Sequence, residues 1–91
     1  MKKTNESMKN IQIGKNLKTL RLMCNLTQTD IAKVLEVTTQ QYQKYETGGC
    51  KISISKMVLL WELFIGEGFA SLTFEDLLGR DVKAGILNKL K

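Results

Sequence analysis

The sequence predicts a small all-α domain of five helices. Proline is absent from the 91 residues, and β-branched residues occur only in short runs, so the composition favours helices over strands. Apolar residues recur three and four positions apart in several segments, as on one face of a helix. Ser or Thr precedes most of these segments and suits a helix N-cap. A chain of this length can build one modest core but not two.

Two helices open the predicted fold. The first covers residues 11–23, where apolar residues recur at helical spacing, and the second covers residues 28–35. Thr27 is a good N-cap for the second helix. Asp30 stands three positions further on, where its carboxylate can point back at the free amides of the first turn. We therefore expect a sharp start to this helix.

A third helix is predicted at residues 39–47, after a very short connection. Thr38 and Gln41 have the Thr-x-x-Gln spacing of a capping box. The pair Gly48-Gly49 ends the helix, because glycine readily adopts the left-handed backbone found at helix C-termini. Two short helices joined by so tight a turn form the core of a helix-turn-helix, whose second helix can enter the DNA major groove.

The remaining helices lie in the second half of the chain. Ser53 is a third N-cap and opens a predicted helix over residues 54–65. Residues 66–71 bear glycines and are predicted to loop, and Thr73 then caps a last helix. The tail predicts a weak amphipathic helix that needs a partner to bury its apolar face. That face consists of Val82, Ile86, Leu87 and Leu90.

The composition argues against an enzyme, a metal site, a cofactor and a small-molecule ligand. The chain has no histidine, no glycine-rich phosphate loop and no nucleophile with a recognisable activating partner. Cys24 and Cys50 lack a CxxC partner, so we expect free thiols that pack as small apolar side chains. There is no long apolar stretch and no signal peptide, which predicts a cytoplasmic protein outside the membrane.

Positive charge is concentrated in one half of the chain. Residues 1–51 hold nine Lys or Arg and four Asp or Glu, whereas residues 52–91 hold five of each. The whole net charge of +5 therefore lies in the first half. A basic half joined to a neutral half is typical of a surface that meets polyanions beside a region for packing or self-association. A chance surplus of basic residues is the alternative.

The third predicted helix has a polar face without an acid. At about 100° per residue, Tyr42 and Tyr45 face inward, and the opposite face presents amide, ammonium and hydroxyl groups. Such groups match base edges, because glutamine pairs with adenine, lysine with guanine, and a threonine methyl with the thymine methyl. The face consists of Thr39, Gln40, Gln43, Lys44 and Thr47. An ordinary solvated helix face is the alternative interpretation.

Other side chains are predicted to contact the DNA backbone. Gln28 opens the second helix, where unpaired amides and the helix dipole favour a phosphate. Lysines elsewhere in the basic half can add phosphate contacts, which would make binding steeply dependent on salt. The predicted backbone set is completed by Lys15, Lys18, Thr38, Thr47 and Lys51.

Over residues 13–64 the sequence resembles the lambda-repressor/Cro type of helix-turn-helix, also called the XRE family. The resemblance rests on IGKNLKTLR, LTQTDIAKVLEV, TTQQYQKYETG and KISISKMVLLW, which occur in this order. It implies a five-helix lambda-repressor-like DNA-binding domain with a C-terminal amphipathic segment. By position it implies that Gln28 binds a phosphate and that Glu46 braces the third helix. Members of the family touch base edges at the positions of Thr39, Gln40 and Lys44, with Gln43 close by.

The sequence departs from the family pattern at three positions. Glu36 stands where the family has its turn glycine, Ile52 replaces a proline, and Trp61 replaces a small residue. Glu36 would be strained if its φ is positive. Trp61 implies a rearranged core near the fourth helix. None of these changes removes a predicted DNA-facing residue.

The chain divides into three predicted parts. These are a flexible N-terminal arm (residues 1–10), a Cro/C1-type helix-turn-helix domain (residues 11–71) and a C-terminal helical segment (residues 72–91). The basic N-terminus is either an arm on the DNA or a loose end. The C-terminal segment can form a homodimer surface, complete the monomer core, or hold a protein partner such as a toxin or RNA polymerase.

Together these features predict a sequence-specific regulator of transcription that binds double-stranded DNA, from a bacterium or a phage. We expect a repressor that binds a palindromic operator as a homodimer, with the third helix of each subunit in the major groove. The alternative is an antitoxin-type protein-interaction module that binds a partner through residues 72–91 and regulates its own operon.

Overall fold

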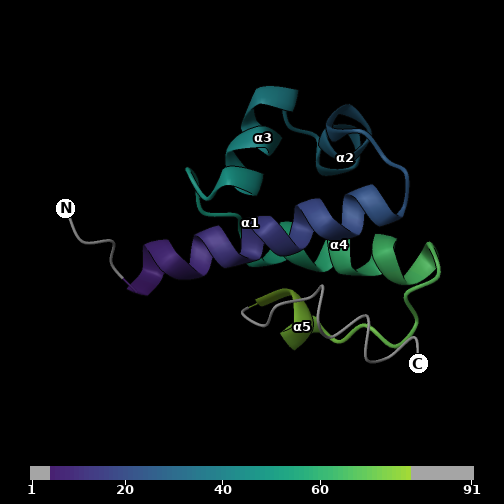
Figure 1. Cartoon of the computed structure of the whole chain (residues 1–91). Coiled ribbons are helices and arrows are strands. Elements are labelled where there is room, and N and C mark those ends of the chain that lie inside the picture. The colour runs from purple at the N-terminus through teal and green to yellow at the C-terminus, as the bar shows by residue number, and fades with distance from the viewer. Residues whose placement is uncertain (1–4, 79–91) are drawn as a thin grey trace.

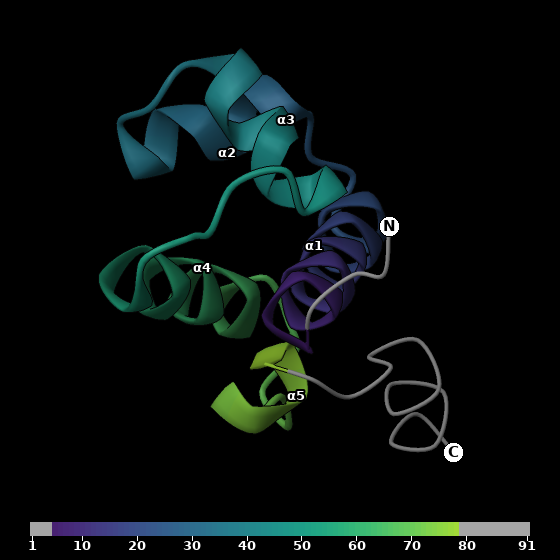
Figure 2. The same cartoon turned by 90° about the vertical axis from the view of Figure 1, so that its left-hand side faces the viewer.

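The computed structural model describes residues 5–78, and all regular structure in that range is helical. The helices are α1 (Asn5–Met23), α2 (Gln28–Leu35), α3 (Thr39–Thr47), α4 (Ile54–Gly66) and α5 (Phe74–Leu78). Helices α2 and α3 lie together on one side of α1 and α4, whereas α5 lies on the opposite side (Figure 1 and Figure 2). The predicted all-α fold class is confirmed.

Helix α1 begins earlier than the sequence predicts. It starts at Asn5 rather than Ile11, so the predicted start is wrong and residues 5–10 of the predicted arm are helical. These residues contain no glycine or proline to break the helix, and Glu6 in the first turn is favourable to the helix dipole. The apolar repeat used for the prediction simply does not extend this far. The remainder of the predicted arm lies outside the described residues.

Two glycines allow α1 and α3 to pack closely. A Cβ atom at Gly14 in α1 would overlap the backbone carbonyls of Tyr45 and Glu46 in α3. Gly48 ends α3 with a left-handed φ of 80°, as predicted, and a Cβ atom there would overlap the backbone of Ile11. The absence of a side chain at these two positions therefore sets the distance between the helices.

The predicted N-caps are present. Thr27 and Asp30 form the full capping box, in which the Thr27 hydroxyl accepts from the Asp30 N–H and the Asp30 carboxylate accepts from the Thr27 N–H. Thr38 accepts from the Gln41 N–H at 3.0 Å, which is one half of the box predicted for α3. Ser53 caps α4. These local bonds position the start of each helix independently of the core.

The turn between α2 and α3 is closed by a residue in an unfavourable backbone conformation. Glu36 adopts φ 57° and ψ 43°, the left-handed region that the family's glycine would occupy without strain. The Val37 N–H donates to the Ala32 carbonyl at 3.0 Å and completes a helix-ending motif. A side chain in this region costs roughly 1–2 kcal/mol. The strain predicted for Glu36 is thus present.

One core joins all five helices. Tyr42 and Phe64 are the largest fully buried side chains, and Cys24 and Cys50 pack at its edge. The buried apolar residues are Leu17, Leu20, Ile31, Ala32, Leu35, Tyr42, Tyr45, Ile52, Met57, Leu60, Phe64, Leu72 and Leu77. The inward position predicted for Tyr42 and Tyr45 agrees with this set.

Helix α5 and the loop before it complete the core of the monomer. Leu72 and Leu77 are buried, and the Asn16 side-chain amide donates to the backbone carbonyls of Asp76 and Leu77, each at 3.2 Å. Of the three roles left open for the C-terminal segment, these contacts support core completion for residues 72–78. The apolar tail residues from Val82 to Leu90 lie outside the described residues.

Trp61 anchors the loop that leads to α5. Its indole N–H donates to the Leu72 carbonyl at 2.9 Å, and its ring meets that of Phe74 edge to face at 6.1 Å. A small residue at this position could make neither contact. The rearranged core predicted from Trp61 therefore takes the form of a tie between α4 and α5.

Candidate nucleic-acid interface

Helix α3 presents three exposed polar side chains on the side away from the core. Gln40, Gln43 and Lys44 are exposed, and among the described residues no side-chain hydrogen bond or ion pair engages them. On the inward side, the buried rings of Tyr42 and Tyr45 meet edge to face at 6.4 Å. The predicted division of α3 into an outward polar face and an inward aromatic face is present.

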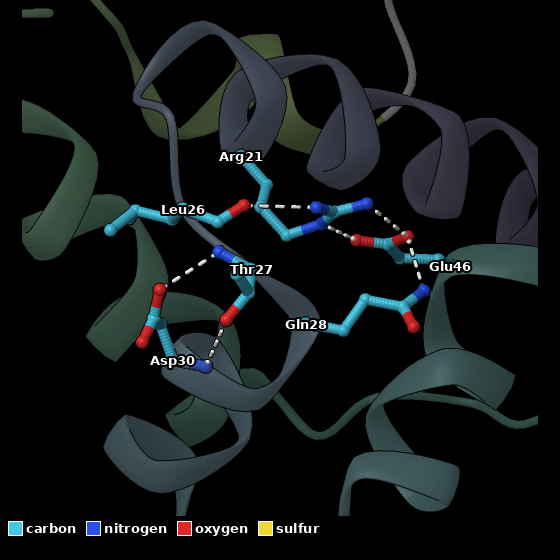
Figure 3. Close-up of polar contacts among 6 residues, drawn as sticks. All are labelled: Arg21, Leu26, Thr27, Gln28, Asp30 and Glu46. Atoms are coloured by element: carbon cyan, nitrogen blue, oxygen red, sulfur yellow. Dashed lines mark hydrogen bonds and ion pairs between the residues drawn. The ribbon is translucent and has the colours of Figure 1, made fainter.

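A buried ion pair holds the inward side of α3 to the end of α1 (Figure 3). Arg21 Nε lies 2.6 Å from Glu46 Oε2, and a second guanidinium nitrogen donates to Oε1 at 3.2 Å. The third Arg21 nitrogen donates to the Leu26 carbonyl at 2.9 Å. The bracing role implied for Glu46 thus rests on two hydrogen bonds with Arg21, which fix both the orientation of α3 and its distance from α1.

The protonation states of this cluster favour a permanent ion pair. Burial alone would raise the pKa of Glu46, but hydrogen bonds from Arg21 and other neighbours outweigh it and lower the pKa. Hydrogen bonding to Glu46 raises the pKa of Arg21. The nearby Tyr42 hydroxyl is buried, which raises the pKa of Tyr42 well above its usual range, so that it stays neutral beside the carboxylate.

Gln28 also belongs to this cluster. Its side-chain amide donates to Glu46 Oε1 at 3.0 Å and thereby ties the first residue of α2 to α3 (Figure 3). The side chain is half-buried. One of the two N–H groups of the Gln28 side-chain amide is thus already used. Its second N–H and the backbone amides of the first turn of α2 remain as donors to a phosphate.

Thr39, the first residue of α3, is held by a residue that the sequence did not single out. Its Oγ1 lies 3.2 Å from the Oγ1 of Thr29 in α2, and either hydroxyl can donate. Both threonines line a surface hollow of about 600 Å³ between the end of α1 and the starts of α2 and α3. The hollow lies beside the polar face of α3 at its N-terminal end.

Thr38 and Thr47 are exposed at the two ends of α3, and their hydroxyls are used differently. The Thr38 oxygen accepts from the Gln41 N–H, which leaves its O–H free to donate to a phosphate. The Thr47 hydroxyl donates to the Lys44 carbonyl at 3.2 Å and would have to release that bond to do the same. Of the two predicted backbone contacts, Thr38 is therefore the better prepared.

The three predicted lysine contacts lie on other elements. Lys15 and Lys18 are exposed three residues apart on α1, and Lys51 is exposed in the loop between α3 and α4. Lys51 Nζ lies 3.4 Å from a carboxylate oxygen of Glu6, but both side chains are more than two-thirds exposed. An ion pair so exposed contributes little and can exchange for a phosphate.

Arg21 and Thr29 are the two residues of this region that the sequence interpretation missed. A glutamate expected to brace a helix from the inside requires a cation, and Arg21 at the end of the first helix was available for that role. Nothing in the sequence distinguishes Thr29, because its importance depends on a contact across the turn.

No helix within residues 5–78 is both long and apolar enough to cross a membrane. In the same part of the chain, no cluster of His, Cys, Asp or Glu could hold a metal ion. Cys24 and Cys50 are free thiols at the edge of the core, as predicted, and burial raises the pKa of Cys24.

The fold and the polar face of α3 define a protein of the helix-turn-helix class. A family model described as Helix-turn-helix matches residues 17–63, from the second half of α1 to near the end of α4. The chain belongs to this family, whose members are DNA-binding transcription regulators rather than enzymes. The resemblance found in the sequence and the exclusion of an enzyme are thereby confirmed.

Two bacterial relatives support the same class. One is an uncharacterised HTH-type transcriptional regulator of Rickettsia conorii, 44 % identical over 50 residues, which are 55 % of this chain and 40 % of the relative. The other is an uncharacterised HTH-type transcriptional regulator of Rickettsia prowazekii, 42 % identical over 50 residues, 55 % of this chain and 38 % of the relative. The match thus spans about two fifths of each relative. No solved structure matches the chain.

Proposed function

We propose that this protein is a cytoplasmic transcriptional repressor that binds a pseudo-palindromic operator as a homodimer. Helix α3 of each subunit lies in the major groove, and the bound dimer blocks access of RNA polymerase. A single α3 offers only a few base contacts, so two half-sites about one helical turn apart are needed for specificity.

The observation that carries this proposal is the exposed strip on α3. Gln40, Gln43 and Lys44 face outward with no acid among them, while Arg21 and Glu46 hold the helix from behind. Amide and ammonium groups held on a rigid helix can form the paired hydrogen bonds that distinguish bases. In this proposal Thr39 completes the base-contacting set.

The proposed phosphate contacts come from the ends of α3 and from α1, α2 and the loop after α3. The first turn of α2 offers backbone amides beside Gln28, and Thr38 retains a free O–H donor. Lys15, Lys18, Thr47 and Lys51 complete the set, and the lysines supply the salt-dependent part of the affinity. These contacts orient α3 in the groove but distinguish no sequence.

Selection of bound duplexes from a random pool tests the proposal. We expect an enriched sequence with two symmetric half-sites. Replacing Gln40 by Ala should then weaken binding to the selected duplex by about 1–3 kcal/mol and relax the preference at one base pair per half-site. Gln41→Ala is the matched control on the same helix, because Gln41 lies outside the strip. An equal loss of affinity on every sequence would argue against base recognition by Gln40.

The oligomeric state needs its own measurement. Sedimentation of the protein with the selected duplex should give two chains per duplex, and a duplex that carries one half-site should bind much more weakly. One chain per full site would contradict the proposed dimer. Copurification of an unrelated protein in equal amount would favour the antitoxin-type alternative.

A further inference from the structure

We propose that Thr29 is a positioning residue for base recognition. By holding the hydroxyl of Thr39, it directs the Thr39 methyl group to the DNA, so that each half-site carries a thymine opposite the start of α3. This inference rests on the proposed function, because it requires α3 to lie in the major groove. It adds a residue of α2 to the determinants of specificity.

The contact joins two helices across the turn. Thr29 is the second residue of α2 and Thr39 the first of α3, and their Oγ1 atoms are 3.2 Å apart. Thr39 is half-buried and Thr29 exposed. The two hydroxyls meet only because the turn through Glu36 folds the start of α3 back towards the start of α2.

The hydrogen bond selects one orientation of the Thr39 side chain. Threonine is branched at Cβ, and its few χ1 rotamers differ in whether the hydroxyl or the methyl points in a given direction. At the first position of a helix, Thr39 has no preceding helical turn whose carbonyl its hydroxyl could bond. Thr29 supplies the partner instead. With the hydroxyl engaged in this way, the methyl is the substituent that this proposal assigns to the base.

A methyl group distinguishes one base by contact. The thymine C5-methyl is the apolar group that base pairs display in the major groove, and a threonine methyl packs against it. The Thr29–Thr39 pair lines the hollow of about 600 Å³ at this end of α3, so it is open to a bound partner. Thymine is therefore the base that the arrangement fits.

Gln28, the other residue of α2 at this end, does not hold Thr39. Its amide nitrogen is bonded to Glu46 on the inward side of α3. The first two residues of α2 consequently have separate roles: Gln28 bonds to Glu46 of α3, and Thr29 orients the side chain of Thr39, the first residue of α3.

The test compares duplexes that differ by one methyl group. The probes are the duplex selected by the wild-type protein and versions in which deoxyuridine replaces each thymine of the half-site in turn, which removes only the C5-methyl. Wild type should bind about fourfold more weakly when one particular thymine is replaced, the effect expected for burial of one methyl-sized group.

Three variants test whether the Thr29–Thr39 pair causes the preference for thymine over deoxyuridine. Thr29→Ser keeps the hydroxyl and should keep the fourfold preference. Thr29→Val keeps the shape but removes the hydroxyl, and Thr39→Ser removes the methyl, so both should bind the thymine and deoxyuridine duplexes equally. Unchanged helicity and melting temperature would show that all three variants fold, as expected for substitutions near the surface.

The outcomes separate this inference from the proposed function. If the pool yields an enriched site but no single thymine methyl matters, or if Thr29→Val retains the preference, the inference is overturned and the proposed function stands. If Thr29→Val weakens binding equally on all duplexes, Thr29 contacts the backbone and does not position Thr39. A pool without any enriched sequence would overturn both.

Discussion

Replacement of Glu46 by Gln tests the buried brace behind α3. The substitution nearly preserves the size of the side chain but leaves the Arg21 guanidinium without its counter-charge. The Arg21 and Glu46 side chains are only 9 % and 3 % exposed, so water cannot take the place of the carboxylate. Removing one partner of a buried ion pair typically costs about 3–5 kcal/mol.

We expect a loss near the lower end of that range, about 3 kcal/mol, because a glutamine oxygen can still accept one hydrogen bond. The carboxylate at present accepts two bonds from Arg21 and one from the Gln28 amide. For a domain of this size, 3 kcal/mol lowers the melting temperature by roughly 12–24 °C. It also removes a large part of a total stability of about 5–15 kcal/mol.

Urea unfolding followed by far-ultraviolet circular dichroism measures the loss. Glu62→Gln on α4 is the matched control, since Glu62 is exposed and its change should stay within about 0.5 kcal/mol. If Glu46→Gln and Glu62→Gln differ by less than 0.5 kcal/mol, roughly the scatter expected for surface changes, the brace does not stabilise the fold. The double variant Arg21→Met, Glu46→Leu should recover part of the loss, because it leaves no charge buried.

Three further predictions concern pH, strain and salt. The pKa of Glu46 is lowered in the fold, so wild type should have its full stability advantage over Glu46→Gln above the ordinary carboxyl pKa of 4.5. This advantage should disappear as the pH falls through the lower pKa of the folded state. Urea unfolding at several pH values checks this, and an advantage unchanged at pH 3 would contradict it. Glu36→Gly should raise the free energy of unfolding by about 0.5–1 kcal/mol, because relief of the strain at this left-handed residue exceeds the extra conformational entropy that glycine loses on folding. A decrease in the free energy of unfolding would show that Glu36 is not strained. Lys51→Ala should lower the slope of log affinity against log salt by about one unit without changing sequence preference. The control is Lys33→Ala, at an exposed lysine in the last turn of α2 outside the proposed phosphate set, which should leave the slope unchanged. Equal slopes for wild type and Lys51→Ala would exclude a phosphate contact.

The parts of the fold that follow local rules were predictable from the sequence. Thr27 with Asp30, Thr38 and Ser53 cap helices within three residues of themselves, so their positions follow from spacing alone. Gly48 ends α3 for the same local reason. By contrast, the first six residues of α1 carry no apolar repeat, so a prediction from that repeat places the start of the helix too late.

The contacts of the candidate site were less predictable than its residues. The outward position of Gln40 and Lys44 follows from helical periodicity, which a sequence displays directly. The bond between Arg21 and Glu46 joins residues 25 positions apart, and its partners become apparent only when α1 and α3 are packed. The Thr29–Thr39 contact depends in the same way on the turn.

The two faces of α3 separate the residues that stabilise the fold from those that we propose to contact DNA. Tyr42, Tyr45 and Glu46 are buried, and a change at any of them disturbs the core or the ion pair. Gln40 and Lys44 are exposed, and their side chains bond to nothing else among the described residues, so their replacement should alter stability by no more than about 0.5 kcal/mol. If α3 reads DNA as proposed, a new operator preference can therefore arise from changes on one side of this nine-residue helix while the fold is maintained from the other.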